Sequence, residues 1–398
     1  MKKGLFRLQY ELDDASAYAE RGSREGAKLS VEDIADPEVR DAIEATRRMD
    51  TRSLMRWVEE TGNLADGMAA LPLTTRTPEA LSFRLEGMRL RLLFILRPLH
   101  TIKDLDEFLY AANAAMANGG YMLCHSMTAV LKRQLIMEKY PWGVRNLFVG
   151  TNYLWHRVCP KLNFTRKFYY AVTQGKNRSF NRVEVLGRLY RAGFEVVEEE
   201  FCKGEFVVVA RKVQAPVNDI APTGSPIIHL RRIGLGGEEI IVHKFRTMYT
   251  YSEYIQGYVY HYQSLERGGK FKDDYRVNEM GHLLRRLWLD ELPMVWNMLC
   301  GEMKLVGVRP LSRQYFNLYT PEMQQLRTRT KPGLLPPFYY DRKTPETIDE
   351  VQESERRYLE AYLQHPFRTD WRYFWGIVGN ILLRRKHSAE KPRMGDSH

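Results

Sequence analysis

The sequence of 398 residues has few cysteines and no long uninterrupted apolar segment. Its four cysteines lie far apart without a C-x-x-C pair, which excludes a zinc knuckle or disulfide framework and favours a reducing compartment. No stretch reaches the roughly 18 continuous apolar residues that a membrane-spanning helix requires. The first residues, MKKGLFRLQYELDD, lack the apolar core of a signal peptide. We therefore expect a cytoplasmic or peripherally membrane-associated protein.

Several catalytic signatures are also missing. The sequence has no H-E-x-x-H, G-x-S-x-G or G-x-x-x-x-G-K-[ST] motif, so metalloprotease, serine hydrolase and P-loop functions have no support. Because 27% of the residues are charged with both signs mixed and 44% are hydrophobic, extended disorder is excluded. A chain of this length is expected to form two or three domains.

Positive charge is in excess. The chain has 60 Lys and Arg against 49 Asp and Glu, a net charge of +11. Such a chain attracts polyanions, which include nucleic acid, anionic lipid headgroups and phosphorylated small molecules. Because no base-reading motif accompanies the charge, we expect no nucleic-acid partner.

The first half of the sequence predicts an α/β domain after a polar helical region. Residues 1–85 are helix-prone and contain no strong strand. The next segments predict a strand over 90–96, a helix over 104–117 that stops at Gly119 and Gly120, and a strand over 121–124. A helix over 182–192 and a hairpin of strands over 194–201 and 205–213 are expected after them.

This order of elements resembles the second half of a class I methyltransferase fold, over residues 86–213. The part that would bind the cofactor is missing, because no G-x-G loop follows a strand in residues 1–85. The resemblance therefore implies a degenerate methyltransferase-like domain with a structural role. Residues 214–225, rich in Pro, Asn, Asp, Thr, Gly and Ser, predict a linker to the next domain.

Basic side chains mark the domain after the linker. Residues 226–248 predict a hairpin that turns at 235–237, and its second strand ends in Lys244 and Arg246. Two cations at i and i+2 share a face of a strand and suit a diphosphate. The alternative is a solvated basic edge that prevents strand aggregation. Farther on, Arg309 and Arg313 present guanidinium groups that match phosphate oxygens.

Two adjacent carboxylates, Asp290 and Glu291, stand in the segment LDELP before a predicted helix that stops at Gly301. The amide groups and dipole of a helix N-terminus favour an ionised carboxylate. The alternative is that Asp290 only caps the helix.

Together these motifs resemble the bacterial sugar transferase family, the monotopic polyprenol-phosphate phosphoglycosyl transferases, over residues 226–370. The matching segments are RIG at 232–234, KFRTM at 244–248, Asp274 with Arg276, Gly281 with Arg285, LDELP at 289–293, LVGVRP at 305–310, Pro332 with Gly333, and Arg342. The expected architecture is thus α/β and α+β: the methyltransferase-like domain, then a small α+β catalytic domain over 226–386 without a transmembrane helix, and a polar tail over 387–398.

The resemblance implies an enzyme with a catalytic dyad of Asp290 and Glu291. The dyad would bind Mg²⁺, and Glu291 would either help to hold the ion or handle the proton. Asp290 would attack the sugar-linked β-phosphate of a UDP-sugar and release UMP, and polyprenol phosphate would then accept the phosphosugar. The reaction is the first step of building a surface glycan such as an exopolysaccharide. The resemblance assigns phosphate or nucleotide contacts to Lys244, Arg246, Arg276, Arg285, Arg309, Arg313 and Arg342.

The chain also departs from the family. A polar linker stands in place of its hydrophobic re-entrant helix, Val308 replaces a proline before Arg309, and LLPPFYYD follows Gly333. The tyrosine-rich stretch 249–270 predicts either a packed amphipathic helix or an interfacial aromatic surface. The stretch 367–386, aromatic and then basic, predicts either a helix in the headgroup region or a final core helix.

We therefore expect peripheral association with the cytoplasmic face of the cell membrane. A rival function is a catalytically silent adaptor that keeps the fold and recruits a glycan-assembly enzyme. The presence of Asp290, Glu291 and Arg309 argues against the adaptor.

Overall fold

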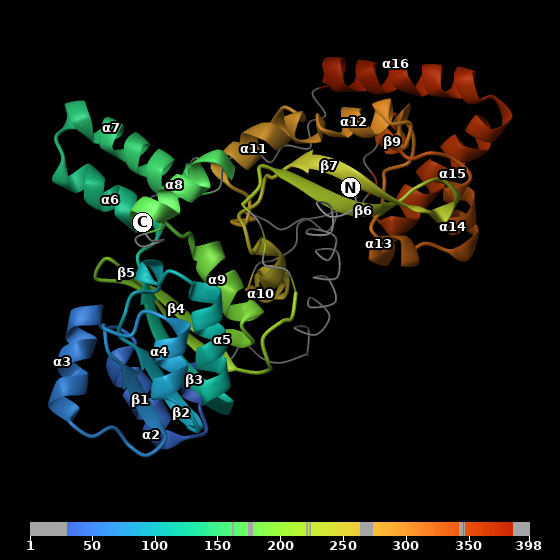
Figure 1. Ribbon diagram of the computed structural model, residues 1–398. Coiled ribbons are helices and arrows are strands. Elements are labelled where there is room, and N and C mark those ends of the chain that lie inside the picture. The colour runs from blue at the N-terminus through green and yellow to red at the C-terminus, as the bar shows by residue number, and fades with distance from the viewer. Residues whose placement is uncertain are drawn as a thin grey trace. The chain divides into compact units, whose positions relative to one another are not determined.

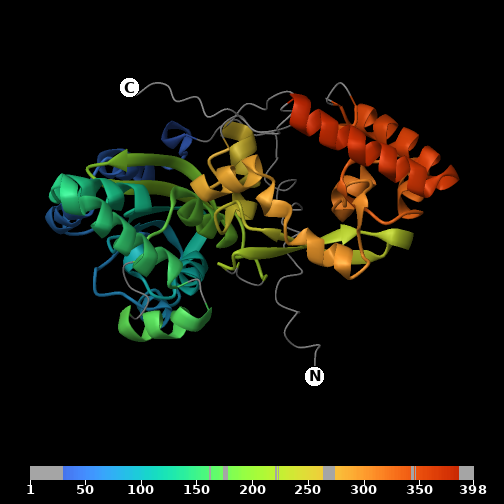
Figure 2. The same ribbon diagram turned by 90° about the horizontal axis from the view of Figure 1, so that it is seen from above.

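A computed structural model describes residues 30–160, 163–173, 178–219, 222, 224–262, 274–341, 345 and 347–384 of the chain. These residues form two units, whose elements are drawn in Figure 1 and, from a second direction, in Figure 2. The N-terminal unit comprises the described residues up to Gly224 together with Tyr249–Tyr258. The C-terminal unit comprises Ser225–Met248 and the described residues from Val259 onward.

A five-stranded sheet in the order β1-β2-β3-β5-β4 forms the centre of the N-terminal unit. Its strands are β1 (Met68–Leu71), β2 (Leu90–Ile95), β3 (Met116–Ser126), β4 (Phe194–Cys202) and β5 (Glu205–Lys212). Strands β1, β2 and β3 are parallel, whereas β5 runs antiparallel to both β3 and β4. The predicted β-α-β unit and the predicted hairpin are confirmed.

Helices connect these strands. They are α2 (Pro37–Thr46), α3 (Thr51–Thr61), α4 (Pro78–Arg84), α5 (Leu105–Ala115), α6 (Ala129–Lys139), α7 (Trp142–Tyr153), α8 (Asn163–Thr173) and α9 (Arg182–Arg191), with short turns η2 (Val31–Asp33), η3 (Leu99–Thr101) and η4 (Leu154–Val158). The predicted helices over 104–117 and 182–192 correspond to α5 and α9.

Gly119 and Gly120 do not end a helix, as the sequence had suggested, because both lie within β3. Gly119 has a left-handed φ of +81°, a conformation that favours glycine. A Cβ on Gly120 would lie 2.7 Å from the carbonyl oxygen of Leu90, so the second glycine allows β3 to approach β2 closely. The glycines therefore serve strand packing.

The helices before residue 85 belong to the same core as the sheet. Val31, Ile43 and Leu54 are buried in one apolar cluster with Leu92 and Phe94. The structure therefore differs from the expected division at residue 85, and it contains a strand, β1, where none was expected. A four-residue strand with one buried position carries too little pattern to be predicted.

The segment Tyr249–Tyr258 returns to the N-terminal unit from the middle of the expected catalytic domain. It forms η6 (Ser252–Ile255) and the first residues of α10 (Gln256–Tyr262). The buried Tyr251 donates a hydrogen bond of 2.5 Å to Asp106, and Tyr254 donates to Asp219. The packed interpretation of the tyrosine-rich stretch is confirmed for these residues, and 263–270 lie outside the described residues.

The predicted linker is also partly folded. Val217 is buried, and Asp219 accepts a 2.8 Å hydrogen bond from Nε of Arg191. The C-terminal unit begins at Ser225, next to the expected start at 226, whereas most of the expected linker and the segment Tyr249–Tyr258 belong to the N-terminal unit. The reason is that the buried partners are far apart along the chain, so no local pattern reports them.

The C-terminal unit starts with an antiparallel hairpin, β6 (Ile227–Ile233) and β7 (Glu239–Phe245), joined at the predicted turn η5 (Leu235–Gly237). Strands β8 (Lys304–Val306) and β9 (Gly333–Leu335) form a short parallel pair. The other elements are α11 (Glu279–Arg286), η7 (Leu289–Glu291), α12 (Met294–Leu299), α13 (Arg313–Asn317), α14 (Pro321–Thr328), η8 (Pro337–Tyr339), α15 (Ile348–Gln364) and α16 (Pro366–Arg384).

Two apolar clusters hold this unit together. One joins β7 to α12 through Val242, Met294 and Met303, and the other gathers α14, α15 and α16 around β8. Lys304 of β8 donates to the hydroxyl of Tyr358 at 2.8 Å and to Asp370 at 3.1 Å. These contacts fix the last two helices to the strand that leads into the V-G-V-R-P turn.

Helix α16 has two different faces. Tyr373 and Ile377 are buried in the core, whereas Phe367, Trp371 and Trp375 are exposed. The core-helix alternative therefore holds for one face, and the basic residues Arg385 and Lys386 lie outside the described residues. Among the helices that the structure describes, none combines the length and apolar character needed to cross a bilayer.

Candidate functional site

The segment LDELP forms a 3₁₀ turn, η7, that contains Asp290 and Glu291. Trp288, directly before the turn, has a φ of +59°, which is uncommon for a residue with a side chain. Its ring packs against Tyr339 at a centroid distance of 5.0 Å. This contact supports a left-handed residue that ends α11 and turns the chain toward the two carboxylates.

Glu291 lies between two cations. Nζ of Lys244 donates to Oε1 of Glu291 at 2.6 Å, and a guanidinium nitrogen of Arg309 lies 3.9 Å from the same oxygen. The side chains of Lys244 and Glu291 are 16% and 24% exposed, whereas that of Arg309 is 51% exposed. The cluster therefore has a mostly buried cation, a bridging carboxylate and a second cation open to solvent.

Asp290 is half-buried beside this cluster. Burial raises the pKa of Asp290, and the neighbouring Glu291 raises it further, while Lys244 and Arg285 act in the opposite direction. Burial also lowers the pKa of Lys244. Shifts in these directions, caused by burial and by specific charged neighbours, are typical of active-site groups.

The helix that follows does not have the expected relation to Asp290. Pro293 is the N-cap residue of α12, which has six residues, and Asp290 lies in the preceding turn. The capping alternative is therefore wrong. The proposed stabilisation of an ionised carboxylate by the helix N-terminus is not seen either, because the pKa of Asp290 is raised.

Lys244 and Arg246, expected to act together, have different partners. Strand β7 ends at Phe245, so Arg246 lies beyond the regular alternation of side chains. Nε of Arg246 donates to the carbonyl oxygen of Ser225 at 2.9 Å. Lys244 therefore contacts Glu291, and Arg246 ties the open end of the hairpin.

Thr247 connects the hairpin to α11, a role that the sequence did not reveal. Nε of Arg285 donates to its hydroxyl at 3.0 Å, and its carbonyl oxygen accepts from the backbone N–H of Asn278. A Cβ on Gly281 would lie 2.0 Å from that carbonyl oxygen, so α11 can approach only because residue 281 is glycine. Arg285 is thereby positioned beside Asp290.

Asn297 is a second positioning residue that sequence reasoning missed. It is fully buried in α12 and accepts a 3.1 Å hydrogen bond from the backbone N–H of His243, next to Lys244. Its amide nitrogen donates to the carbonyl oxygen of Ile241 and to Glu302. An asparagine among the apolar positions of a short helix is the signal that was available for it.

Arg309 is held by the turn that presents it. Gly307 and Gly333 are in such close contact that a Cβ on Gly333 would lie 2.1 Å from the backbone nitrogen of Gly307. The carbonyl oxygen of Arg309 accepts a 2.6 Å hydrogen bond from Arg327, which pairs with the buried Glu355. Arg327 therefore fixes the backbone of Arg309, while the guanidinium of Arg309 is half-exposed.

Two of the remaining predicted contacts, Arg276 and Arg313, have ion-pair partners of their own. Arg276 is buried in a 2.8 Å ion pair with Asp274, in the turn before α11. Arg313 pairs with Glu239, which is separated from Lys244 by about 16 Å of β7. Arg342 lies outside the described residues.

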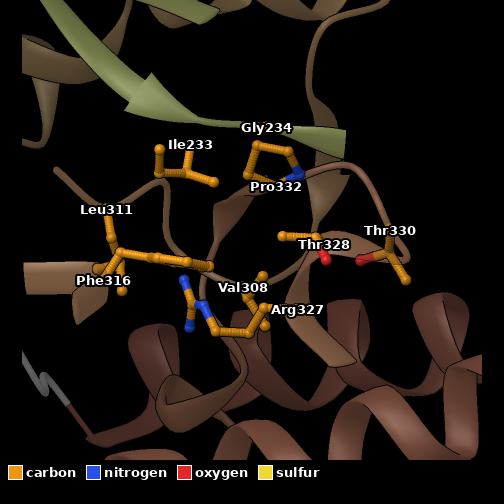
Figure 3. Close-up of a pocket in the computed structure, with 9 residues that line it drawn as sticks. All are labelled: Ile233, Gly234, Val308, Leu311, Phe316, Arg327, Thr328, Thr330 and Pro332. Carbon is orange, nitrogen blue, oxygen red and sulfur yellow. The ribbon is translucent and has the colours of Figure 1, made fainter. Parts of the chain in front are cut away.

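A small pocket lies behind the Arg309 turn. Figure 3 shows its lining, in which Arg327 lies beside Val308. None of its nine lining residues is a predicted site residue. The pocket therefore lies among the residues that support the Arg309 turn, and the charged cluster is not part of its lining.

The carboxylates fit only one kind of metal site. Among the described residues, no group of three or more His, Cys, Asp and Glu side chains is placed to hold a metal ion. Asp290 and Glu291 offer two adjacent carboxylates. Mg²⁺ commonly uses one or two carboxylates together with substrate phosphates and water, so this donor set suits a metal shared with a diphosphate.

Comparison with known proteins gives one matching family. Its profile, described as bacterial sugar transferase, matches residues 207–382. The exopolysaccharide production protein ExoY of Rhizobium meliloti (strain 1021) is 30% identical over 157 residues, which cover 38% of this chain and 69% of the relative. The uncharacterized sugar transferase EpsL of Bacillus subtilis (strain 168) is 38% identical over 28% of this chain and 49% of the relative.

A third relative has a more specific name. The UDP-glucose:undecaprenyl-phosphate glucose-1-phosphate transferase of Xanthomonas campestris pv. campestris is 34% identical over 28% of this chain and 22% of the relative. The chain thus spans half or less of the length of several curated relatives that it matches. A solved O-methyltransferase family protein from Burkholderia thailandensis covers 35% of this chain at 15% identity, with a TM-score of 0.20 that supports no argument about the fold.

Proposed function

The chain belongs to the bacterial sugar transferase family, and from this premise we propose that it transfers a phosphosugar from a UDP-sugar to polyprenol phosphate. The observation that carries the proposal is the half-buried Asp290 beside Glu291, Lys244 and Arg309. The names of relatives support the substrate classes, since they include UDP-sugars and undecaprenyl phosphate.

In the proposed reaction Asp290 is the nucleophile. Its carboxylate oxygen attacks the phosphorus that carries the sugar, the bond from that phosphorus to the bridging oxygen breaks, and UMP leaves with the electron pair. A phosphate oxygen of polyprenol phosphate then attacks the same phosphorus and displaces the Asp290 carboxylate. The products are UMP and a polyprenyl-diphosphate sugar.

The cations around Asp290 supply the charge that the reaction needs. Arg309, half-exposed, is open to the diphosphate, and Lys244 and Arg285 lower the pKa of Asp290 toward the ionised, nucleophilic form. Glu291 orients Lys244 through their 2.6 Å hydrogen bond. Asp290 and Glu291 would hold Mg²⁺ together with the diphosphate, and the bound ion supplies charge neutralisation.

Apolar side chains around the dyad suit the lipid acceptor. Leu287, Leu292, Trp296 and Leu299 of the α11–α12 region are exposed. Exposed apolar side chains next to an anionic-substrate site fit a polyprenol chain at a membrane surface. We propose peripheral attachment to the inner face of the cell membrane, with the aromatic face of α16 contributing.

For the N-terminal unit we propose a structural role. Three parallel strands followed by an antiparallel hairpin support the methyltransferase-like interpretation, and the absence of a G-x-G loop in residues 1–85 argues against a bound adenosylmethionine. Calorimetric titration with adenosylmethionine tests this part, and heat of binding would contradict it.

The central test is intact-protein mass spectrometry after incubation with Mg²⁺ and a panel of UDP-sugars, without lipid acceptor. A mass gain equal to a phosphosugar is expected in the wild type and not in Asp290→Asn. Arg313→Gln is the matched control and should gain the same mass as the wild type. If no donor gives a gain, and no UMP appears when polyprenol phosphate is added, the adaptor becomes the better account.

A further inference from the structure

A helical insertion, which we define as α6, η4, α7 and α8 (residues 129–173), lies between β3 and α9 of the N-terminal unit. Figure 1 shows the three α-helices grouped together at one end of this unit. Neither α6 nor α7 has a single buried residue. Helices of a folded unit usually bury one face, so these two present an unusually large accessible surface.

That surface is rich in large apolar side chains. Trp142 is 77% exposed, Phe164 is 81% exposed and Leu147 is 67% exposed. The other exposed large apolar residues of the insertion are Val130, Leu135, Val144, Phe148, Tyr153, Leu154, Phe168 and Val172. Isolated exposed apolar residues are common, but this many in one insertion mark an interaction site.

The charge of the insertion is strongly one-sided. Residues 129–173 contain eight Lys and Arg and one acidic residue, Glu138. Among the side chains that the structure describes, Arg133, Lys139 and Lys167 are exposed. Aromatic and aliphatic side chains interleaved with cations fit the headgroup region of an anionic bilayer, where the cations meet phosphates and the rings enter the acyl boundary.

The insertion is a defined platform, since ring contacts hold its helices together. Tyr140 and Phe148 stack at 4.1 Å, which joins α6 to α7. Trp155 lies 5.6 Å from Tyr169 of α8, and Tyr169 is fully buried. These ring contacts thus hold the three helices in place, and the exposed apolar side chains lie on the surface of the helices.

We propose that the helical insertion is a docking surface for anionic phospholipid bilayers. The excess of cations selects the occupant, because a second copy of this surface would bring like charges together. The proposal goes beyond the sugar transfer reaction. It assigns a membrane contact to the N-terminal unit, whereas α11, α12 and α16 belong to the other unit.

The test is co-sedimentation of the full chain with vesicles of phosphatidylcholine alone or with 30 mol% phosphatidylglycerol, without sugar donor. Arg133→Glu/Lys139→Glu/Lys167→Glu should lower the partition coefficient on anionic vesicles by at least about ten-fold. Trp142→Ser/Leu147→Ser/Phe164→Ser should lower it on both kinds of vesicle. Wild-type binding to the anionic vesicles should weaken as salt is raised.

Matched variants of the same unit provide the controls. Arg76→Glu/Arg84→Glu/Arg89→Glu reverses three exposed cations outside the insertion, and Phe83→Ser removes a phenylalanine that is 85% exposed. Both should bind vesicles like the wild type. Asp290→Asn should also bind normally, so failure of the proposed reaction and failure of lipid docking are separately visible.

Three results would overturn the proposal. The first is wild-type partition of the two insertion variants when their circular dichroism and melting are unchanged. The second is an equal loss of binding in the control variants. The third is a wild-type dimer that the Trp142→Ser/Leu147→Ser/Phe164→Ser variant dissociates, since a second copy would then occupy the surface.

Discussion

Two clusters in the C-terminal unit have similar composition and different exposure. In the site, Glu291 contacts Lys244 and lies near Arg309, whose side chain is 51% exposed. Among the residues that support the Arg309 turn, Arg327 pairs with Glu355, and their side chains are only 4% and 1% exposed. Each cluster joins carboxylates to cations, yet one is open to solvent and the other is closed.

The difference lies in what each cluster can still bind. Arg327 uses its guanidinium on Glu355 and on the carbonyl oxygen of Arg309, and it also packs 4.8 Å from the ring of Tyr319. The site instead brings two cations to one oxygen of Glu291 and leaves Arg309 half-exposed. We infer that the closed pair stabilises the turn and that the open cluster receives the substrate.

Breaking the closed pair should have the largest effect on stability. Glu355→Gln leaves the buried Arg327 without its counter-charge, which costs about 3–5 kcal/mol and lowers the melting temperature by roughly 10 °C. Calorimetry of the full chain measures the change. Arg327→Met/Glu355→Leu removes both charges and should recover most of the loss. A single variant as stable as the wild type would contradict this role.

The corresponding change in the open cluster should affect activity instead. Glu291→Gln removes the charge that orients Lys244, and we expect UMP release to fall by about 100-fold. Because Glu291 is only partly buried and Arg309 beside it is half-exposed, the melting temperature should change by less than about 3 °C. An equal loss of stability in Glu291→Gln and Glu355→Gln would erase the distinction between the two clusters.

Arg309 and Arg313 sharpen the comparison between two arginines that lie four residues apart. Arg309→Lys keeps the charge but loses the planar fork that matches phosphate oxygens, so kcat/KM for the UDP-sugar should fall by about ten-fold. Arg313 pairs with Glu239 at the far end of β7, and Arg313→Lys should therefore leave the kinetics unchanged. Steady-state kinetics of both variants measure the difference, and an equal loss of kcat/KM in the two would contradict it.

The sequence predicted the elements of the fold better than their grouping. The hairpins, β-α-β unit and helix after LDELP follow from turn glycines and apolar runs, which are local features. The limits of the units depend on contacts such as Tyr251 with Asp106, which are 145 residues apart. No spacing rule reports a buried tyrosine–carboxylate pair at that separation.

The site shows the same division. Asp290, Glu291, Lys244 and Arg309 come together as the resemblance implied, because their motifs lie on β7, η7 and one turn of a single unit. Arg276 and Arg313 have other partners, since a basic residue in a sequence motif carries no record of the carboxylate beside it. Thr247 and Asn297 were missed because their partners, Arg285 and the backbone of His243, are far away in the sequence.

The pH profile should separate the two titrating groups of the site. The proposed nucleophile is ionised Asp290, and burial raises its pKa, so activity should rise as pH increases through that raised value. Burial lowers the pKa of Lys244, so its charge should be lost at a lower pH than for a free lysine, and activity should then fall. Lys244→Arg should move the alkaline decline to higher pH. An unmoved decline would assign it to another group.

The smallest effect tests whether Asp290 is kept at a cost in stability. Because its pKa is higher in the folded protein, ionisation disfavours folding once the pH rises through that value. Asp290→Asn should therefore raise the melting temperature by roughly 1–2 °C at pH 7 while abolishing the covalent intermediate. The gain should vanish below the ordinary carboxyl value of 3.8, where Asp290 is protonated in both states. Calorimetry at both pH values measures it, and a variant less stable than the wild type at pH 7 would show that the ionised carboxylate supports the fold.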